Sequence, residues 1–131
     1  ISGTAIAAKG INPKIRVYAC EPSGADDAYR SFKNKKFIPS KNPDTIADGL
    51  LTSLGKLTFP AIMKYVDDIL LVDDQKIIQA MQLIWERMKI VVEPSSAVPL
   101  AALMENRHLF SGKKTGIILS GGNVQLDKLP F

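Results

Sequence analysis

Residues 69–89, ILLVDDQKIIQAMQLIWERMK, decide the fold class. Ile69 to Val72 is an apolar run of strand length, and Asp73 follows it as a helix N-cap. The helix predicted from Asp73 to Lys89 carries its apolar residues on one face. These are Ile77, Ile78, Met81, Ile84, Trp85 and Met88. A buried strand followed directly by an amphipathic helix indicates an α/β protein.

The same alternation extends in both directions. The sequence predicts helices over 1–9, 24–33, 59–66 and 94–106, and strands over 15–20 and 115–119. We expect Gly10 to end the first helix, Ser23 and Asp26 to form a capping box, and residues 34–57 to form a long loop with a short ordered piece at 45–50. Strands alternating with helices predict a parallel sheet covered by helices on both faces. In such sheets ligands bind beyond the carboxyl ends of the strands.

Composition limits the class of protein further. The chain has 131 residues, 46% of them apolar and 23% charged, which suits one domain with a real core. No apolar run is long enough to span a membrane, and no secretory signal pattern is present, so we expect no membrane partner and a cytoplasmic location. One cysteine, Cys20, excludes an internal disulfide, and together with a single histidine, His108, it excludes a Cys/His zinc cage.

The net charge of +4 comes from a basic excess near the first third of the chain. It lies in Arg30, Lys33, Lys35, Lys36 and Lys41. No aromatic platform or recognition motif accompanies these side chains, so a solvated helix end and loop is favoured over a nucleic-acid patch.

Ser120-Gly121-Gly122-Asn123 follows a predicted strand directly. Paired glycines allow a backbone to approach a ligand closely, and a serine hydroxyl there can bond to a ring nitrogen. An ordinary strand-to-helix turn explains the same four residues equally well.

Acidic residues follow the predicted strand over 15–20 and lie in the short extended link that precedes the helix over 94–106. Glu21, Asp27 and the carbonyl of Ala25 offer hard oxygen ligands suited to Mg²⁺ or Ca²⁺, but capping of the helix that follows is the favoured explanation on its own. Glu93 is either a helix cap preceding Pro94 or a buried acid beside a cofactor.

Four stretches in register resemble the C-terminal half of the catalytic domain of serine racemase and its relatives, the serine/threonine dehydratases, which are pyridoxal-phosphate enzymes of fold type II. They are IRVYACEPSGADDAYRS (15–31), TIADG (45–49), WERMKIVVEP (85–94) and IILSGGNV (117–124). The chain begins at Ile1, inside a helical stretch without a cap. We therefore expect residues upstream and treat 1–131 as a single partial domain.

The resemblance implies a role for each matching residue. Ser120 faces the pyridine nitrogen of pyridoxal 5'-phosphate, and Glu93 lies near its ring. Asp48 and Gly49 line the substrate side of the pocket. The resemblance also assigns two further sites: Glu21, Asp27 and the Ala25 carbonyl hold Mg²⁺ (or Ca²⁺ or Mn²⁺), and Lys89 and Asn123 belong to an ATP effector site at a homodimer interface in serine racemases.

The family's Schiff-base lysine, its opposite-face serine and its phosphate-binding glycine loop have no counterpart in residues 1–131. The resemblance thus implies an enzyme that racemises or dehydrates a small β-hydroxy amino acid such as L-serine or L-threonine. An N-terminal half would supply the catalytic residues, and this chain alone would be inactive. The alternative is a non-catalytic association module that complements a separate N-terminal half.

Overall fold

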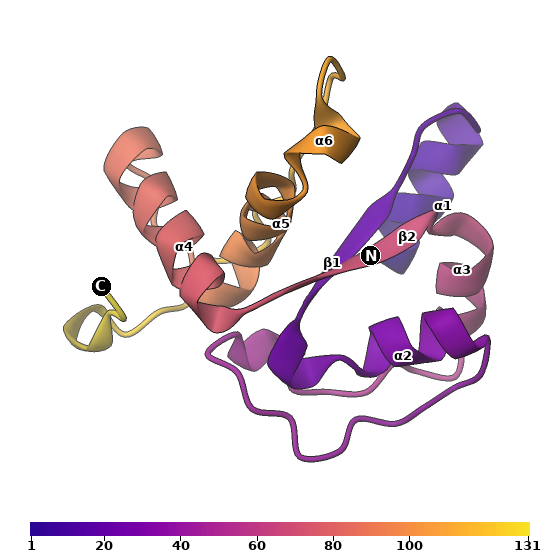
Figure 1. The fold of residues 1–131 in the computed structure, drawn as a ribbon, viewed down its shortest axis with the longest axis horizontal. Coiled ribbons are helices and arrows are strands. Elements are labelled where there is room, and N and C mark those ends of the chain that lie inside the picture. Colours follow the sequence, from indigo (N-terminus) through magenta and orange to yellow (C-terminus); the bar gives the residue numbers. More distant parts are fainter.

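The computed structural model describes residues 1–131, with two parallel strands at its centre and helices on both sides (Figure 1). The strands are β1 (Tyr18–Pro22) and β2 (Asp68–Val72). The longer helices are α1 (Ser2–Ile11), α2 (Asp27–Asn34), α3 (Thr58–Tyr65), α4 (Asp74–Met88) and α5 (Pro94–Glu105). A short helix, α6 (Arg107–Phe110), and 3₁₀ turns at Ser23–Ala25, Asp48–Leu50 and Leu126–Lys128 complete the chain. This confirms the predicted α/β class with a parallel sheet.

Each face of the sheet has its own core because side chains alternate along the strands. Leu70 and Val72 lie in the larger core, which α4 and α5 cover. Ile69 points the opposite way, into a smaller core with Ala5 of α1 and Ile62 of α3. Figure 1 shows the two groups of helices on opposite sides of the strands. This two-sided burial explains why the strands are apolar runs.

The amphipathic helix α4 forms as the sequence pattern of residues 73–89 predicts. Asp73 caps α4 by accepting a hydrogen bond from the Lys76 N–H at 2.8 Å, and Lys89 ends the helix with a left-handed backbone, φ 56°. Ile77, Met81 and Ile84 are buried on the face toward α5. The long loop over 34–57 is also confirmed, with its ordered piece at Asp48–Leu50.

Several boundaries differ from the prediction. Helix α1 continues through Gly10 to Ile11, so that glycine does not end it. Strand β1 begins at Tyr18, not at residue 15, because its partner begins there: Tyr18 pairs with Asp68. The capping box is also wrong, because Ser23 lies in a 3₁₀ turn and makes no cap bond, and the N-cap of α2 is Asp26.

The strand predicted over 115–119 is not part of the sheet. Its residues have no regular secondary structure and make no backbone–backbone hydrogen bond. An apolar, β-branched sequence favours an extended chain, but a strand also needs a paired neighbour, and β1 and β2 pair only with each other.

Candidate functional site

Glu21 lies at the carboxyl end of β1, directly against the start of α2. Its side chain is 8% exposed, and its carboxylate accepts hydrogen bonds from the backbone N–H groups of Ala28 at 3.1 Å and Tyr29 at 2.8 Å. Glu21 therefore performs the capping that Ser23 was expected to supply. Burial raises the pKa of Glu21 to about 7, and the two N–H bonds oppose that shift only in part.

Asp27, the first residue of α2, carries a second buried carboxyl group at this end of the sheet. It is 1% exposed, and neither carboxylate oxygen has a hydrogen-bond partner. Burial raises the pKa of this carboxyl; the backbone amide of Leu54 opposes the shift, but it does not reach hydrogen-bond geometry. A buried carboxylate without a partner is costly unless something else neutralises it.

Glu21, Ala25 and Asp27 surround a single tight turn. Ala25 is 3% exposed, and the negative charge of Asp27 adds to the burial that raises the pKa of Glu21. The structure contains no cluster of three acidic, histidine or cysteine side chains, and the set here is two carboxylates and one backbone carbonyl. Hard oxygen donors with one carboxylate unsatisfied fit a divalent cation.

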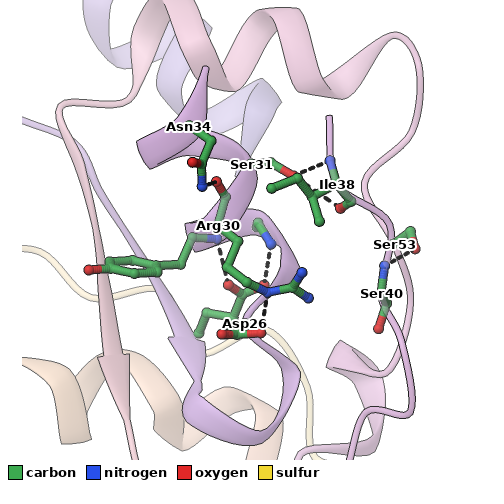
Figure 2. A network of polar contacts seen from close by, with 10 residues as sticks. Asp26, Arg30, Ser31, Asn34, Ile38, Ser40 and Ser53 are labelled. Carbon is green, nitrogen blue, oxygen red and sulfur yellow. Dashed lines mark hydrogen bonds and ion pairs between the residues drawn. The ribbon is translucent and has the colours of Figure 1, made fainter. Parts of the chain in front are cut away.

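The long loop is fastened beside this turn by a network of polar contacts (Figure 2). The Ser31 hydroxyl accepts from the Ile38 N–H and donates to its carbonyl, and Asp26 pairs with Arg30 at 2.7 Å. The loop then passes so close to the turn that a side chain at Gly24 would overlap the Asp44 carbonyl, at 1.7 Å from its Cβ. Gly24 is therefore required for this crossing.

Ser120 and the two glycines after it rest on the start of α5. The Ser96 hydroxyl is fully buried; it accepts from the Gly121 N–H and donates to the Gly121 carbonyl, both at 2.7 Å, and lies 3.3 Å from the Ser120 Oγ. Glu93 adds two bonds: its N–H donates to the Gly121 carbonyl at 3.1 Å, and its carboxylate accepts from the Asn123 N–H at 2.9 Å.

Gly122 is needed for this contact because its neighbour is backbone, whereas a side chain at Gly121 would displace the Glu93 carboxylate. A Cβ at Gly121 would lie 2.9 Å from a Glu93 carboxylate oxygen, and one at Gly122 would lie 2.6 Å from the Val91 carbonyl. The structure thus brings Ser120 and Glu93 together, and Glu93 acts on the loop rather than as a simple helix cap, since its side chain makes no cap bond.

Asp48 and Gly49 lie on the other side of the α5 start. The Gly49 N–H donates to the Ser95 Oγ at 3.0 Å and to the Asp48 carboxylate at 2.8 Å. The same segment is fastened to α4 at its beginning, because the Asp74 carboxylate accepts from the Thr45 hydroxyl at 2.5 Å and from the Ile46 N–H at 2.9 Å.

A cavity of about 920 Å³ opens between these segments. Ser120, Glu21, Ser95 and Cys20 are among its lining residues, whereas Glu93, Asp48 and Gly49 lie outside the lining. Burial raises the pKa of the Cys20 thiol to about 12, so this thiol stays protonated and is not a nucleophile. The volume suits a small-molecule site, and its lining mixes apolar side chains with polar and cationic ones such as Arg16 and Lys114.

Lys89 is exposed at the C-terminal end of α4, and Asn123 is exposed in the loop beside the start of α5. Asn123 uses its backbone N–H to bind Glu93, and no bond joins the Lys89 and Asn123 side chains. The residues that hold the site segments in place were not predicted from the sequence; they are Ser96, Ser95, Asp74 and Thr45. The only local signal was the run of two serines after Glu93-Pro94.

Comparison with known proteins gives the class that this fold and site define. Residues 1–121 match the family described as "Pyridoxal-phosphate dependent enzyme". The chain belongs to that family. It is 50% identical over its whole length to a beta-hydroxyaspartate dehydratase of Paracoccus denitrificans, and 53% identical over 98% of its length to a serine racemase of Dictyostelium discoideum.

Solved structures agree with the sequence relatives. Maize serine racemase superposes with a TM-score of 0.91 at 47% identity over 96% of this chain, and a T.th. threonine deaminase superposes with 0.90 at 40% identity over 95%. This confirms the predicted fold type II architecture. The chain covers 42% and 41% of the two sequence relatives, and 40% and 46% of the two solved chains.

Two further findings concern the wider setting. No helix of the structure combines the length and the apolar character needed to cross a bilayer. The relatives above are more than twice as long as this chain.

Proposed function

We propose that this chain is one partial domain of a pyridoxal-phosphate enzyme that acts on a small β-hydroxy amino acid. The reaction removes the Cα proton and then either returns a proton to the other face or expels the β-hydroxyl as water, giving a keto acid and ammonia. Relatives named serine racemase, beta-hydroxyaspartate dehydratase and L-threo-3-hydroxyaspartate ammonia-lyase support this substrate class. The carrying observation is the Ser120 hydroxyl, held at the cavity wall by Ser96.

Bound pyridoxal phosphate supplies an electron sink for the substrate Cα. Ser120 would meet its ring nitrogen with a neutral hydroxyl. A carboxylate there would hold a proton on the nitrogen and strengthen the sink, whereas a hydroxyl does so much less. Ser120 therefore keeps electron density near Cα and favours reprotonation or loss of the β-hydroxyl. Gly121 and Gly122 allow the chain to approach, and Glu93 fixes the loop that carries Ser120.

Asp48 and Gly49 would form the substrate side of the pocket in the complete enzyme, next to Leu50, which lines the cavity in this chain. The Gly49 N–H is taken by Ser95 and Asp48, so this turn is fixed before a substrate arrives. A fixed wall orients an amino acid without further ordering on binding.

Glu21, Asp27 and the Ala25 carbonyl would hold Mg²⁺, Ca²⁺ or Mn²⁺. The unpartnered Asp27 carboxylate supports this assignment, because a bound cation would neutralise its negative charge. The cation would tie the end of β1 to α2 and to the loop that crosses Gly24, and so would stabilise the pocket wall.

Lys89 and Asn123 would contribute to a nucleotide site, with ATP as the effector, at the interface of a cytoplasmic homodimer. Their exposure and the nearness of the Asn123 segment to Glu93 support this proposal. Such a site would connect an effector to the loop that carries Ser120.

The test uses the full-length protein with pyridoxal phosphate and L-serine, L-threonine or hydroxyaspartate as substrates. We expect D-amino acid or keto acid as product. Ser120→Ala should lower the rate and weaken cofactor binding, and Ser120→Asp should shift the ratio of racemisation to elimination. Full activity in both variants would contradict the role of Ser120.

A further inference from the structure

Ser96 has a hydrogen-bond arrangement that its place in a helix does not require. It lies in the first turn of α5, is 0% exposed, and its own N–H already bonds to the Glu93 carbonyl at 3.0 Å. Its hydroxyl is directed away from its own helix, toward a residue 25 positions later in the chain. A buried hydroxyl bonded at 2.7 Å to both the N–H and the carbonyl of one residue holds that residue firmly.

Ser120 depends on this contact for its position. The five residues before it, 115–119, make no backbone–backbone hydrogen bond, so no sheet fixes the approach to Ser120. Beyond it, the loop is held at Gly121 by Ser96 and Glu93 and at Asn123 by Glu93. Ser96 is the only one of these groups that also contacts the Ser120 side chain.

The hydroxyl of Ser96 has one proton and two lone pairs. Its proton goes to the Gly121 carbonyl and one lone pair receives the Gly121 N–H, both at 2.7 Å. Only a lone pair remains for Ser120, so Ser120 is the donor in the pair. At 3.3 Å this bond is long for two hydroxyls and yields readily to a better acceptor.

We propose that Ser96 is a positioning residue that fixes the place of Ser120. This rests on the proposed function, in which Ser120 meets a ring nitrogen. The Ser120 hydroxyl has one proton, so it can donate to an unprotonated ring nitrogen only by giving up its long bond to Ser96. The two bonds between Ser96 and Gly121 would hold the Ser120 backbone in place through that change.

The first test measures the position of the loop without cofactor. Amide hydrogen exchange of residues 117–124 is compared in the full-length apo protein for wild type, Ser96→Ala and Ile84→Val. Ile84→Val removes one methylene from the same core, beside Ile117 and Leu119, and removes none of the hydrogen bonds that hold the loop. We expect exchange about tenfold faster in Ser96→Ala only, since a hydrogen bond contributes on the order of a factor of ten. Unchanged exchange overturns the inference, whatever the cofactor results show.

The second test asks whether Ser96 acts through Ser120. The dissociation constant of pyridoxal phosphate and the pH dependence of its absorbance are measured for Ser96→Ala, Ser120→Ala and the double variant. We expect the double variant to have the same dissociation constant as Ser120→Ala. We also expect Ser96→Ala to change the pH dependence of the absorbance, and Ile84→Val to leave it unchanged. Independent losses that multiply in the double variant overturn the inference. A wild-type protein that binds no pyridoxal phosphate overturns the proposed function instead, and the exchange experiment still decides about Ser96.

Discussion

At the scale of single residues, Glu21 and Asp27 are two carboxylates buried where helix N–H groups satisfy only one of them. The pKa of Glu21 is raised to about 7 from 4.5. Between these pH values the folded protein binds more protons than the unfolded chain, so the free energy of unfolding falls as the pH rises through this window. A shift of this size corresponds to roughly 3 kcal/mol at full ionisation.

We therefore expect the full-length protein, treated with a chelator, to lose thermal stability between about pH 4.5 and pH 7. Added Mg²⁺ should restore it, because a cation that binds only the folded form stabilises that form. Glu21→Gln should abolish the response to Mg²⁺ and reduce the pH dependence, of which the buried Asp27 keeps its own part. Melting temperatures at about pH 5 and about pH 8, with and without Mg²⁺, measure this. A Mg²⁺ response that survives in Glu21→Gln would show that the ligand set is wrong.

Gly122 provides a second residue-scale prediction, because its Cβ position is only 2.6 Å from the Val91 carbonyl. Gly122→Ala should push the Ser120 loop away and cost about 1–3 kcal/mol, as overpacking does. Gly3→Ala is the matched control, since nothing lies within 4 Å of its Cβ position in α1. The control should be neutral or slightly stabilising. Equal denaturation midpoints for the two variants would contradict the tight contact.

At the scale of elements, Asp73 and Asp74 divide two tasks at the start of α4. Asp73 caps the helix through the Lys76 N–H, whereas Asp74 holds the segment that begins at Thr45. Asp74→Ala should loosen residues 45–49 and raise KM for the amino acid about tenfold, because two hydrogen bonds are lost. Asp73→Ala should destabilise the helix by about 1 kcal/mol and leave KM unchanged. Limited proteolysis of the 34–57 loop and steady-state kinetics distinguish the two, and equal KM values would contradict this division.

Helix α4 and strand β1 show which structural features can be predicted from the sequence and which cannot. The limits of α4 follow from a local pattern and its cap, so they are predictable. The start of β1 is not, because register with Asp68 sets it. The end of β1 identifies Glu21 as a candidate, whereas Ser120 is selected at the end of a predicted strand that the structure does not form. The roles of Ser96 and Asp74 cannot be predicted in this way, because each depends on a distant loop that packs against the start of its helix. Ser96 binds Gly121, 25 residues away, and Asp74 binds Thr45 and Ile46, 29 and 28 residues away.

At the scale of the whole molecule, several large apolar side chains lack a cover. Ile11 is 83% exposed and Ile118 is 58% exposed, and residues 115–119 carry backbone groups without partners. Exposed apolar surface next to an unpaired extended segment marks an interaction surface. The cavity that contains Ser120 opens among these same segments. We expect the remainder of a longer polypeptide to cover this surface and to supply the lysine that the proposed reaction requires.

The 131-residue chain alone should therefore catalyse no reaction. Incubated with pyridoxal phosphate and L-serine, it should yield neither D-serine nor pyruvate, because none of its lysines occupies the role of the covalent anchor. Supplying the upstream half as a separate polypeptide should restore turnover if the two halves pair through the surface around Ile118. Ile118→Asp should block that restoration, whereas Glu105→Ala on the exposed end of α5 should not. Turnover by the chain alone would require a catalytic base among these residues and would refute the division of labour proposed here.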